Sequence, residues 1–248
     1  MKSWLMSLLG RGRVGPPLNN TQRQLVQRHI PAHQRLATSQ KEKLESATSM
    51  LIHRRRWEGC GGLTLTEEMK TVVACHAAMM LLGTHDYHFE SVNSILLFPG
   101  TIRRDGHDRY TANVGEAWAN GGIVLSWPEV KAIRQQRDGR NVVIHEFAHH
   151  LDGLDGEMGG SIPFNNRKDQ ARWDRASTEG LQQLIRDVEA GKRTVLDPYG
   201  ATNRAEFFAV CSESFFELPT TMRHAHEELY ELLSLFYHVD PEQWAGDL

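Results

Sequence analysis

Hydrophobic residues recur with a helical period through much of the first third of the chain. Over residues 22–56 the apolar positions fall three or four residues apart, with an interruption near Pro31. Thr66, a residue type that caps helices, then precedes two glutamates and a further stripe of apolar side chains. This spacing predicts helices through most of residues 21–90, so we expect a mainly helical N-terminal region.

Two short aliphatic runs follow, and each is bounded by residues that break regular structure. Residues 94–98 end at Pro99 and residues 123–127 end at Pro128, so both runs predict strands of a small sheet. Beyond them the pattern is again helical, with helices expected at residues 142–152, 179–189, 205–218 and 226–237. The sequence therefore predicts an α+β fold, with the sheet and the functional helices in residues 91–248.

The first 20 residues differ in character from the rest of the chain. Residues 10–20 are rich in glycine and proline, which predicts a linker between a short N-terminal segment and one domain spanning residues 21–248. The apolar start is too brief for an export signal, and no later stretch approaches the ~20 apolar residues of a membrane span. We expect a protein that is neither exported nor embedded in a membrane.

Charge and cysteine content narrow the functional classes. The 248 residues include 28 basic and 31 acidic side chains, so the overall charge does not favour a nucleic-acid partner. Three scattered cysteines, Cys60, Cys75 and Cys211, form neither a disulfide framework nor a Cys-x-x-Cys metal site. A cytoplasmic location is expected.

Candidate chemistry centres on His145-Glu146-Phe147-Ala148-His149. Four residues apart on a helix, His145 and His149 project from one face and can bind a single zinc ion, with Glu146 as the general base. A chance match in a chain of this composition has a probability of about a few per cent. The apolar residues around the motif predict a buried helix, where these polar side chains would need a partner such as a metal.

A catalytic zinc site needs a third protein ligand, and the residues offer two kinds. Asp155 stands six residues after His149, where one class of metallopeptidase places its third histidine. The other candidates lie on the helix predicted at 205–218, where Glu206, Glu213 and Glu217 share one stripe. We expect a solvent-facing position most readily for Glu217 and least for Glu206. A structural zinc site ranks last, since it normally closes with four protein ligands.

At this point the sequence resembles the Mlc titration factor A family, zinc peptidases whose catalytic domain is similar to that of anthrax lethal factor. The resemblance covers nearly all of the chain from about Trp57 onward. It rests on Trp-Glu-Gly at 57–59 with Leu-Thr-Leu-Thr-Glu-Glu-Met at 63–69, Gly-Ile-Val-Leu-Ser-Trp at 122–127, Asn-Val-Val-Ile-His-Glu-Phe-Ala-His at 141–149, and Ala-Glu-Phe-Phe-Ala-Val at 205–210 with Ser-Glu at 212–213.

The resemblance implies a zincin-like fold and a gluzincin site, with one zinc ion per chain held by His145, His149 and Glu206. Glu146 would be the base. It also singles out Tyr199, whose hydroxyl would hydrogen-bond the oxyanion of the tetrahedral intermediate. From the residues alone, this tyrosine would be packed on the flank of a turn.

Further expectations concern the support of the site and its partners. Glu213 is a candidate acceptor for the second ring nitrogen of a ligand histidine. Residues 123–127 would form either a sheet edge that pairs with an extended substrate peptide or an ordinary core strand. The resemblance implies an aminopeptidase acting on peptides or proteins. The alternative is a regulatory protein that binds and titrates the transcriptional repressor Mlc, with hydrolysis secondary.

Overall fold

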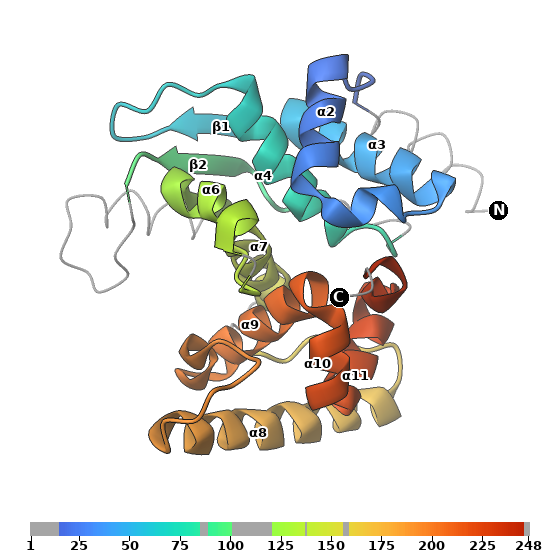
Figure 1. Cartoon of the computed structure of the whole chain (residues 1–248), viewed down its shortest axis with the longest axis vertical. Coiled ribbons are helices and arrows are strands. Elements are labelled where there is room, and N and C mark those ends of the chain that lie inside the picture. The colour runs from blue at the N-terminus through green and yellow to red at the C-terminus, as the bar shows by residue number, and fades with distance from the viewer. Residues whose placement is uncertain (1–14, 85–88, 101–120, 137, 156–158, 246–248) are drawn as a thin grey trace.

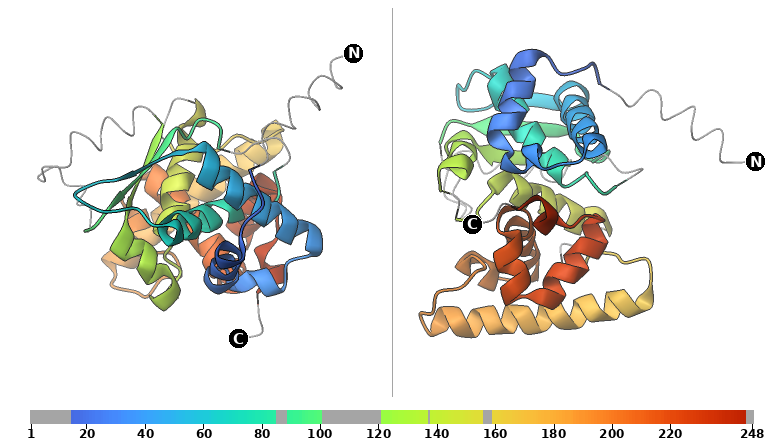
Figure 2. Two further views of the ribbon diagram at one scale, coloured as in Figure 1. Left: turned by 90° about the horizontal axis from the view of Figure 1, so that it is seen from above. Right: turned by 45° about the vertical axis from the view of Figure 1, so that its right-hand side comes forward.

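The structure is a computed structural model, and it describes residues 15–84, 89–100, 121–136, 138–155 and 159–245. The N-terminal helices and the sheet form one end of the molecule, and the C-terminal helices form the other (Figures 1 and 2). Helix α7 lies between these two parts and contacts both of them, through α4 and β3 on one side and α9 on the other.

The N-terminal part is helical because capping residues stand directly before stripes of apolar side chains with helical spacing. Asn19 and Gln22 form a reciprocal capping box, and Thr66 accepts a hydrogen bond of 3.2 Å from the backbone N–H of Met69. Helix α4 is buried from Thr71 to Met79, since α2 and α3 pack against it. The elements are α2 (Asn20–His29), η1 (Pro31–Gln34), α3 (Thr38–Arg54) and α4 (Glu67–Met79).

Three parallel strands make up the sheet in the order β1-β2-β3, namely β1 (Arg56–Gly59), β2 (Ser94–Phe98) and β3 (Gly122–Ser126). Alternate side chains point to opposite faces. Ile95 and Leu125 join the main core, whereas Leu96, Phe98 and Val124 form a small cluster with Cys60 on the other face. Both faces of β2 and β3 are therefore covered.

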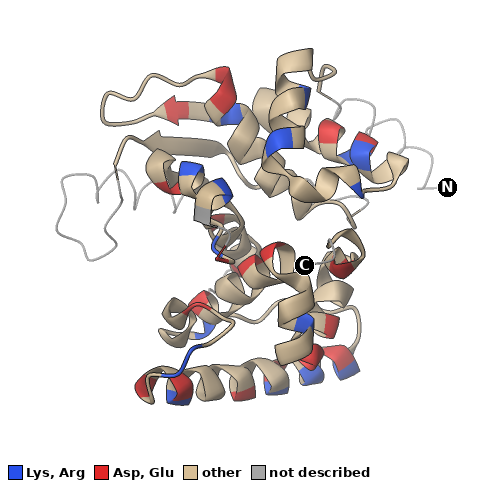
Figure 3. Cartoon of the chain, in the orientation of Figure 1, with Lys and Arg blue, Asp and Glu red and all other residues tan. Residues whose placement is uncertain are grey.

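Helices dominate the rest of the chain. Acidic and basic residues are interspersed along the 23-residue helix α8 at the edge of the molecule (Figure 3), while its buried Trp173 faces the core. The elements are α6 (Trp127–Gln136), α7 (Val142–Asp152), η2 (Gly153–Asp155), α8 (Arg167–Glu189), η3 (Pro198–Ala201), α9 (Arg204–Glu217), α10 (Pro219–Ala225), α11 (Glu227–Tyr237) and η4 (Pro241–Trp244).

The α+β class and both predicted strands are confirmed, with corrections at the boundaries. The expected helix through residue 56 ends at Arg54, because Arg56 pairs with Ser94 in β1. The helix expected at 179–189 begins at Arg167, and Trp127 starts α6 rather than ending a strand. Most of the expected N-terminal segment lies outside the described residues, so the division at residue 20 stays a prediction.

Within the described part of the chain, no helix combines the length and the hydrophobicity needed to cross a lipid bilayer.

Candidate metal centre

Helix α7 places the His-Glu-x-x-His motif in the interior of the molecule. Asn141 caps the helix, since its Oδ1 accepts hydrogen bonds of 3.1 Å from the backbone N–H groups of both Val143 and Ile144. Phe147, within the motif, is fully buried. This packing fixes the helix and aims His145 and His149 toward α9.

Three potential ligand atoms converge between α7 and α9. Nε2 of His145 lies 3.1 Å from Nε2 of His149, and Oε2 of Glu206 lies 3.0 Å and 3.2 Å from these two nitrogens. His145 is buried, and the other two side chains are half-buried. These three residues form the group that can hold a metal ion within the described part of the chain.

The first turn of α9 fixes Glu206. Asn203 caps this helix, and its Oδ1 accepts a hydrogen bond of 2.9 Å from the backbone N–H of Glu206. Tyr199 reaches the same carboxylate from η3, with its hydroxyl donating to Oε1 of Glu206 at 3.3 Å. The tyrosine is 41% exposed, so its hydroxyl lies at the boundary between the site and solvent.

Glu213, two turns further along α9, supports His145 from behind. Its Oε1 lies 2.7 Å from Nδ1 of His145, and its Oε2 accepts a hydrogen bond of 2.5 Å from the backbone N–H of Asn141. A carboxylate at Nδ1 keeps the hydrogen on that nitrogen and leaves the Nε2 lone pair for a metal. For His149, Nδ1 is buried with no hydrogen-bond partner among the described residues, so the two histidines are supported unequally.

The electrostatics of this group are those of a cation site. Burial opposes protonation of His145, but hydrogen bonds to Glu206 and Glu213 outweigh it and raise the pKa of His145 to about 9, with the nearby charge of Glu146 adding to the effect. Burial also opposes ionisation of Glu206, yet hydrogen bonds to His145 and His149 hold the pKa of its carboxyl well below the usual range. The site favours a positive charge among these three groups.

The donor set fits a metal ion. Two imidazole nitrogens and one carboxylate oxygen are the ligand types of catalytic zinc sites, which leave a fourth position open. Ligand atoms about 2.0–2.1 Å from a tetrahedral zinc ion would lie about 3.3 Å apart, close to the separations of 3.0–3.2 Å seen here. Asp155, the other candidate ligand, ends η2, and its side chain is outside the described part.

A cavity of about 670 Å³ opens beside His145, which is the one candidate ligand among its described lining residues. His145, Tyr199 and Glu213 line it on one side, and α6 contributes Glu129 and Ile133. Glu146 follows His145 on α7 and is buried. His145 and Tyr199 thus border a space large enough for part of a peptide.

Sequence reasoning missed the hydrogen bonds around Asn141. Its Nδ2 donates to Oε1 of Glu217 at 2.6 Å and lies 3.0 Å from Nδ1 of His76. The expectation that Glu217 faces solvent is therefore wrong, because this half-buried carboxylate pairs with the cap of α7. An asparagine directly before an apolar helical run signals a cap, but only the tertiary structure shows what its amide nitrogen binds.

A buried His-Glu-x-x-His helix that faces a carboxylate on a second helix defines the class of protein, a metallopeptidase. The chain belongs to the family described as "Glucose-regulated metallo-peptidase M90", whose sequence model matches residues 11–238.

Relatives of similar length support this membership. The chain is 33% identical to the "Uncharacterized protein slr2042" of Synechocystis sp. over 243 residues, which cover 89% of this chain and 88% of the relative. It is 30% identical to "Mlc titration factor A" of Serratia proteamaculans, with 86% and 85% covered. It is 28% identical to the protein of that name from Yersinia pestis, with 89% and 87% covered.

Proposed function

We propose that the chain is a zinc-dependent aminopeptidase of the gluzincin type, with a zincin-like fold and one zinc ion per chain held by His145, His149 and Glu206. The observation that carries this proposal is the approach of two imidazole nitrogens and one carboxylate oxygen to within 3.2 Å of one another. Hydrogen bonding of Glu213 to the far side of His145 supports it, because ligand histidines normally donate their second N–H to such an acceptor.

Roles for the chain's own residues follow from their positions. The chemistry that zinc supplies when bound is Lewis-acid activation of water and of the scissile carbonyl group. Glu146, beside the first ligand, takes the proton of the attacking water and passes it to the leaving amine. The hydroxyl of Tyr199 turns from Glu206 to the oxyanion that develops on the substrate, and so stabilises the transition state more than the ground state.

The lining of the cavity beside His145 supports the proposed preference for a free amino terminus. Glu129 contributes a carboxylate that complements a positively charged α-amino group, while Arg140, which lines the same cavity, is paired with Asp197. Among the described strands β3 pairs with β2 alone, which supports pairing of its other edge with an extended substrate peptide. A cytoplasmic location remains a prediction from the cysteine content.

Metal content and hydrolysis test this proposal together. Wild type should hold about one zinc ion per chain and should cleave amino-acid p-nitroanilides but not their N-acetylated forms. Glu206→Ala should lose both metal and activity, whereas Asp155→Ala, the matched acidic control, should keep both. Glu146→Gln should keep the metal and lose turnover. Loss of metal only in the Asp155 variant would overturn the ligand assignment.

A second candidate function rests on what the relatives are named for. Two of them are called Mlc titration factor A, which favours binding of the repressor Mlc as a further or principal role. If the two activities are separate, Glu146→Gln should bind purified Mlc as wild type does while failing to hydrolyse p-nitroanilides. Loss of both properties in a folded, metal-loaded Glu146→Gln protein would show that they are not separate.

A further inference from the structure

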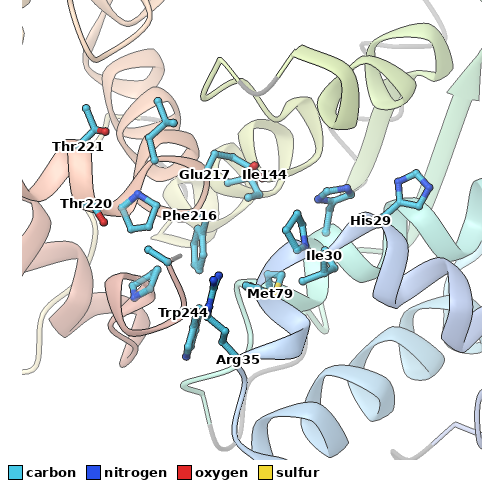
Figure 4. A pocket seen from close by; sticks show the side chains of 17 residues that line it. His29, Ile30, Arg35, Met79, Ile144, Phe216, Glu217, Thr220, Thr221 and Trp244 are labelled. Carbon is cyan, nitrogen blue, oxygen red and sulfur yellow. The ribbon is translucent and has the colours of Figure 1, made fainter. Parts of the chain in front are cut away.

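A second cavity lies behind the amino-terminal end of α7, between the N-terminal helices and the C-terminal helices (Figure 4). Its volume is about 220 Å³. The described residues that line it include neither the three candidate metal ligands nor Glu146. Much of the wall is apolar, with contributions from Ile30, Met79, Ile144, Phe216, Pro219 and Trp244.

His76 is one of the residues that line this cavity, and Asn141 determines which nitrogen of its ring carries the hydrogen. The Oδ1 atom of Asn141 accepts two backbone N–H groups, so its other amide atom is the NH₂ donor. That donor lies 3.0 Å from Nδ1 of His76, which must therefore accept. Burial, together with the neighbouring His29, lowers the pKa of His76 to about 3, so the ring is neutral and its hydrogen is on Nε2.

No acceptor for this hydrogen is present in the described part of the chain. His76 is 3% exposed, and its Nε2 is buried without a hydrogen-bond partner there. Nδ1 of His29, on the same wall, is likewise buried and unpartnered among these residues. A buried N–H without an acceptor destabilises the folded protein, and most such groups are satisfied by protein, water or a ligand.

Size and charge limit what can fill the cavity. An engineered apolar cavity of about 150 Å³ holds benzene, so a slightly larger space suits one ring with a small polar substituent. Glu217 lines the same cavity, and burial raises the pKa of its carboxyl to about 7 despite the hydrogen bond from Asn141. The exposed Arg35 lines the cavity as well, so its wall carries charges of both signs and favours neither an anionic nor a cationic occupant.

We propose that this cavity is a binding site for a small neutral molecule that joins an apolar ring to a carbonyl oxygen, with that oxygen accepting the hydrogen bond from Nε2 of His76. The apolar walls bury the ring. The carbonyl oxygen accepts the hydrogen of His76 Nε2, the buried N–H group that the tautomer of this ring provides.

Benzamide and toluene are suitable probes, because both carry a phenyl ring and only benzamide carries a carbonyl group. Binding to the full, metal-loaded chain is followed by NMR, through the indole N–H of Trp244 in the cavity wall. Benzamide should bind with a dissociation constant on the order of 1 mM. It should bind about fivefold to tenfold more tightly than toluene, as expected for one additional buried hydrogen bond.

Two variants locate the site. Thr221 is exposed and lies at the cavity, so Thr221→Trp should fill its mouth and weaken benzamide binding at least about tenfold. Thr64 is exposed and away from the lining, so Thr64→Trp is the matched control and should bind as wild type does. In His76→Phe, benzamide should lose its advantage over toluene.

Each result of these binding experiments either supports or overturns the proposed site. Equal affinity for benzamide and toluene in wild type, undiminished binding to Thr221→Trp, or no binding of benzamide would each overturn the proposal. Should His76→Phe fail to fold, the comparison of the two threonine variants still decides. Because none of these readouts measures hydrolysis, they also stay independent of the peptidase assignment.

Discussion

Replacement of Glu213 by glutamine would test how the structure supports His145, one of the proposed metal ligands. Glu213 is 6% exposed and accepts hydrogen bonds on both oxygens, from Nδ1 of His145 at 2.7 Å and from the backbone N–H of Asn141 at 2.5 Å. Glutamine has the same shape but only one acceptor oxygen, and its NH₂ group can only donate. In Glu213→Gln, therefore, either Nδ1–H of His145 or the backbone N–H of Asn141 must face the NH₂ group of the glutamine.

The expected effect has two measurable parts. Loss of the acceptor that orients a ligand histidine typically lowers metal affinity about 10-fold to 100-fold, which corresponds to about 1.4–2.7 kcal/mol. In the metal-free protein, one buried donor without an acceptor should lower the free energy of unfolding by about 1–3 kcal/mol. Both effects should appear although the three proposed ligands are all retained in this variant.

Zinc affinity is measured by competition with a chromophoric chelator, and stability by urea unfolding of the metal-free protein. The matched control is Glu179→Gln, which makes the same chemical change at an exposed position on α8. Its ion pair with Arg175 is a surface pair, so the control should change stability by no more than about 0.5 kcal/mol.

The reasoning would be refuted by a Glu213→Gln protein that binds zinc as tightly as wild type. This holds even if the variant is less stable than wild type. In that case Glu213 would serve only to hold α7 and α9 together, and the hydrogen bond to His145 would not orient the ligand.

Two further predictions concern Tyr199 and Glu217. Tyr199→Phe should lower kcat for p-nitroanilides about 10²-fold to 10³-fold with metal content unchanged, and an unaltered kcat would exclude an oxyanion role. Glu217→Gln should alter how stability depends on pH, because burial raises the pKa of this carboxyl from 4.5 in the unfolded chain to about 7 in the folded protein. The folded state then binds more protons, so wild type should lose about 3 kcal/mol relative to the variant as pH rises from below 4.5 to above 7. Urea unfolding of both proteins with a chelator present measures this difference, and parallel pH profiles would contradict the raised pKa.

Local signals predicted the elements of the site but not their neighbours. The helix that carries His145 is marked by a capping asparagine, an apolar run and a terminal glycine, and the structure places it at Val142–Asp152. The short strand β1 was missed because four residues starting with Arg56 carry no apolar run, and pairing with β2 defines it instead. Its partner lies about 38 residues further along the chain, beyond the reach of any local pattern.

The proposed third metal ligand shows the same limit of local sequence signals. From spacing alone, Asp155 and the acidic residues of the later helix were both open, and the resemblance favoured Glu206. The structure brings Glu206 to both histidines, although it lies 61 residues after His145 and 57 after His149. Contacts at such separation depend on how α7 and α9 pack, which neither helix encodes by itself.

The packing of α7 against α9 gives Glu206 and Glu217, two carboxylates of one helical stripe, different chemistry. The two helices run in opposite directions, since Glu206 meets His145 and His149, whereas Glu217 meets Asn141 at the start of α7. Beside two imidazoles, the pKa of Glu206 is held low, but beside a neutral amide, burial raises that of Glu217 to about 7. A stripe of acidic residues therefore provides an ionised carboxylate, the proposed metal ligand, at one end and a carboxyl group that readily binds a proton at the other. The positions of His145 and Asn141 on α7, rather than the glutamates themselves, set this division.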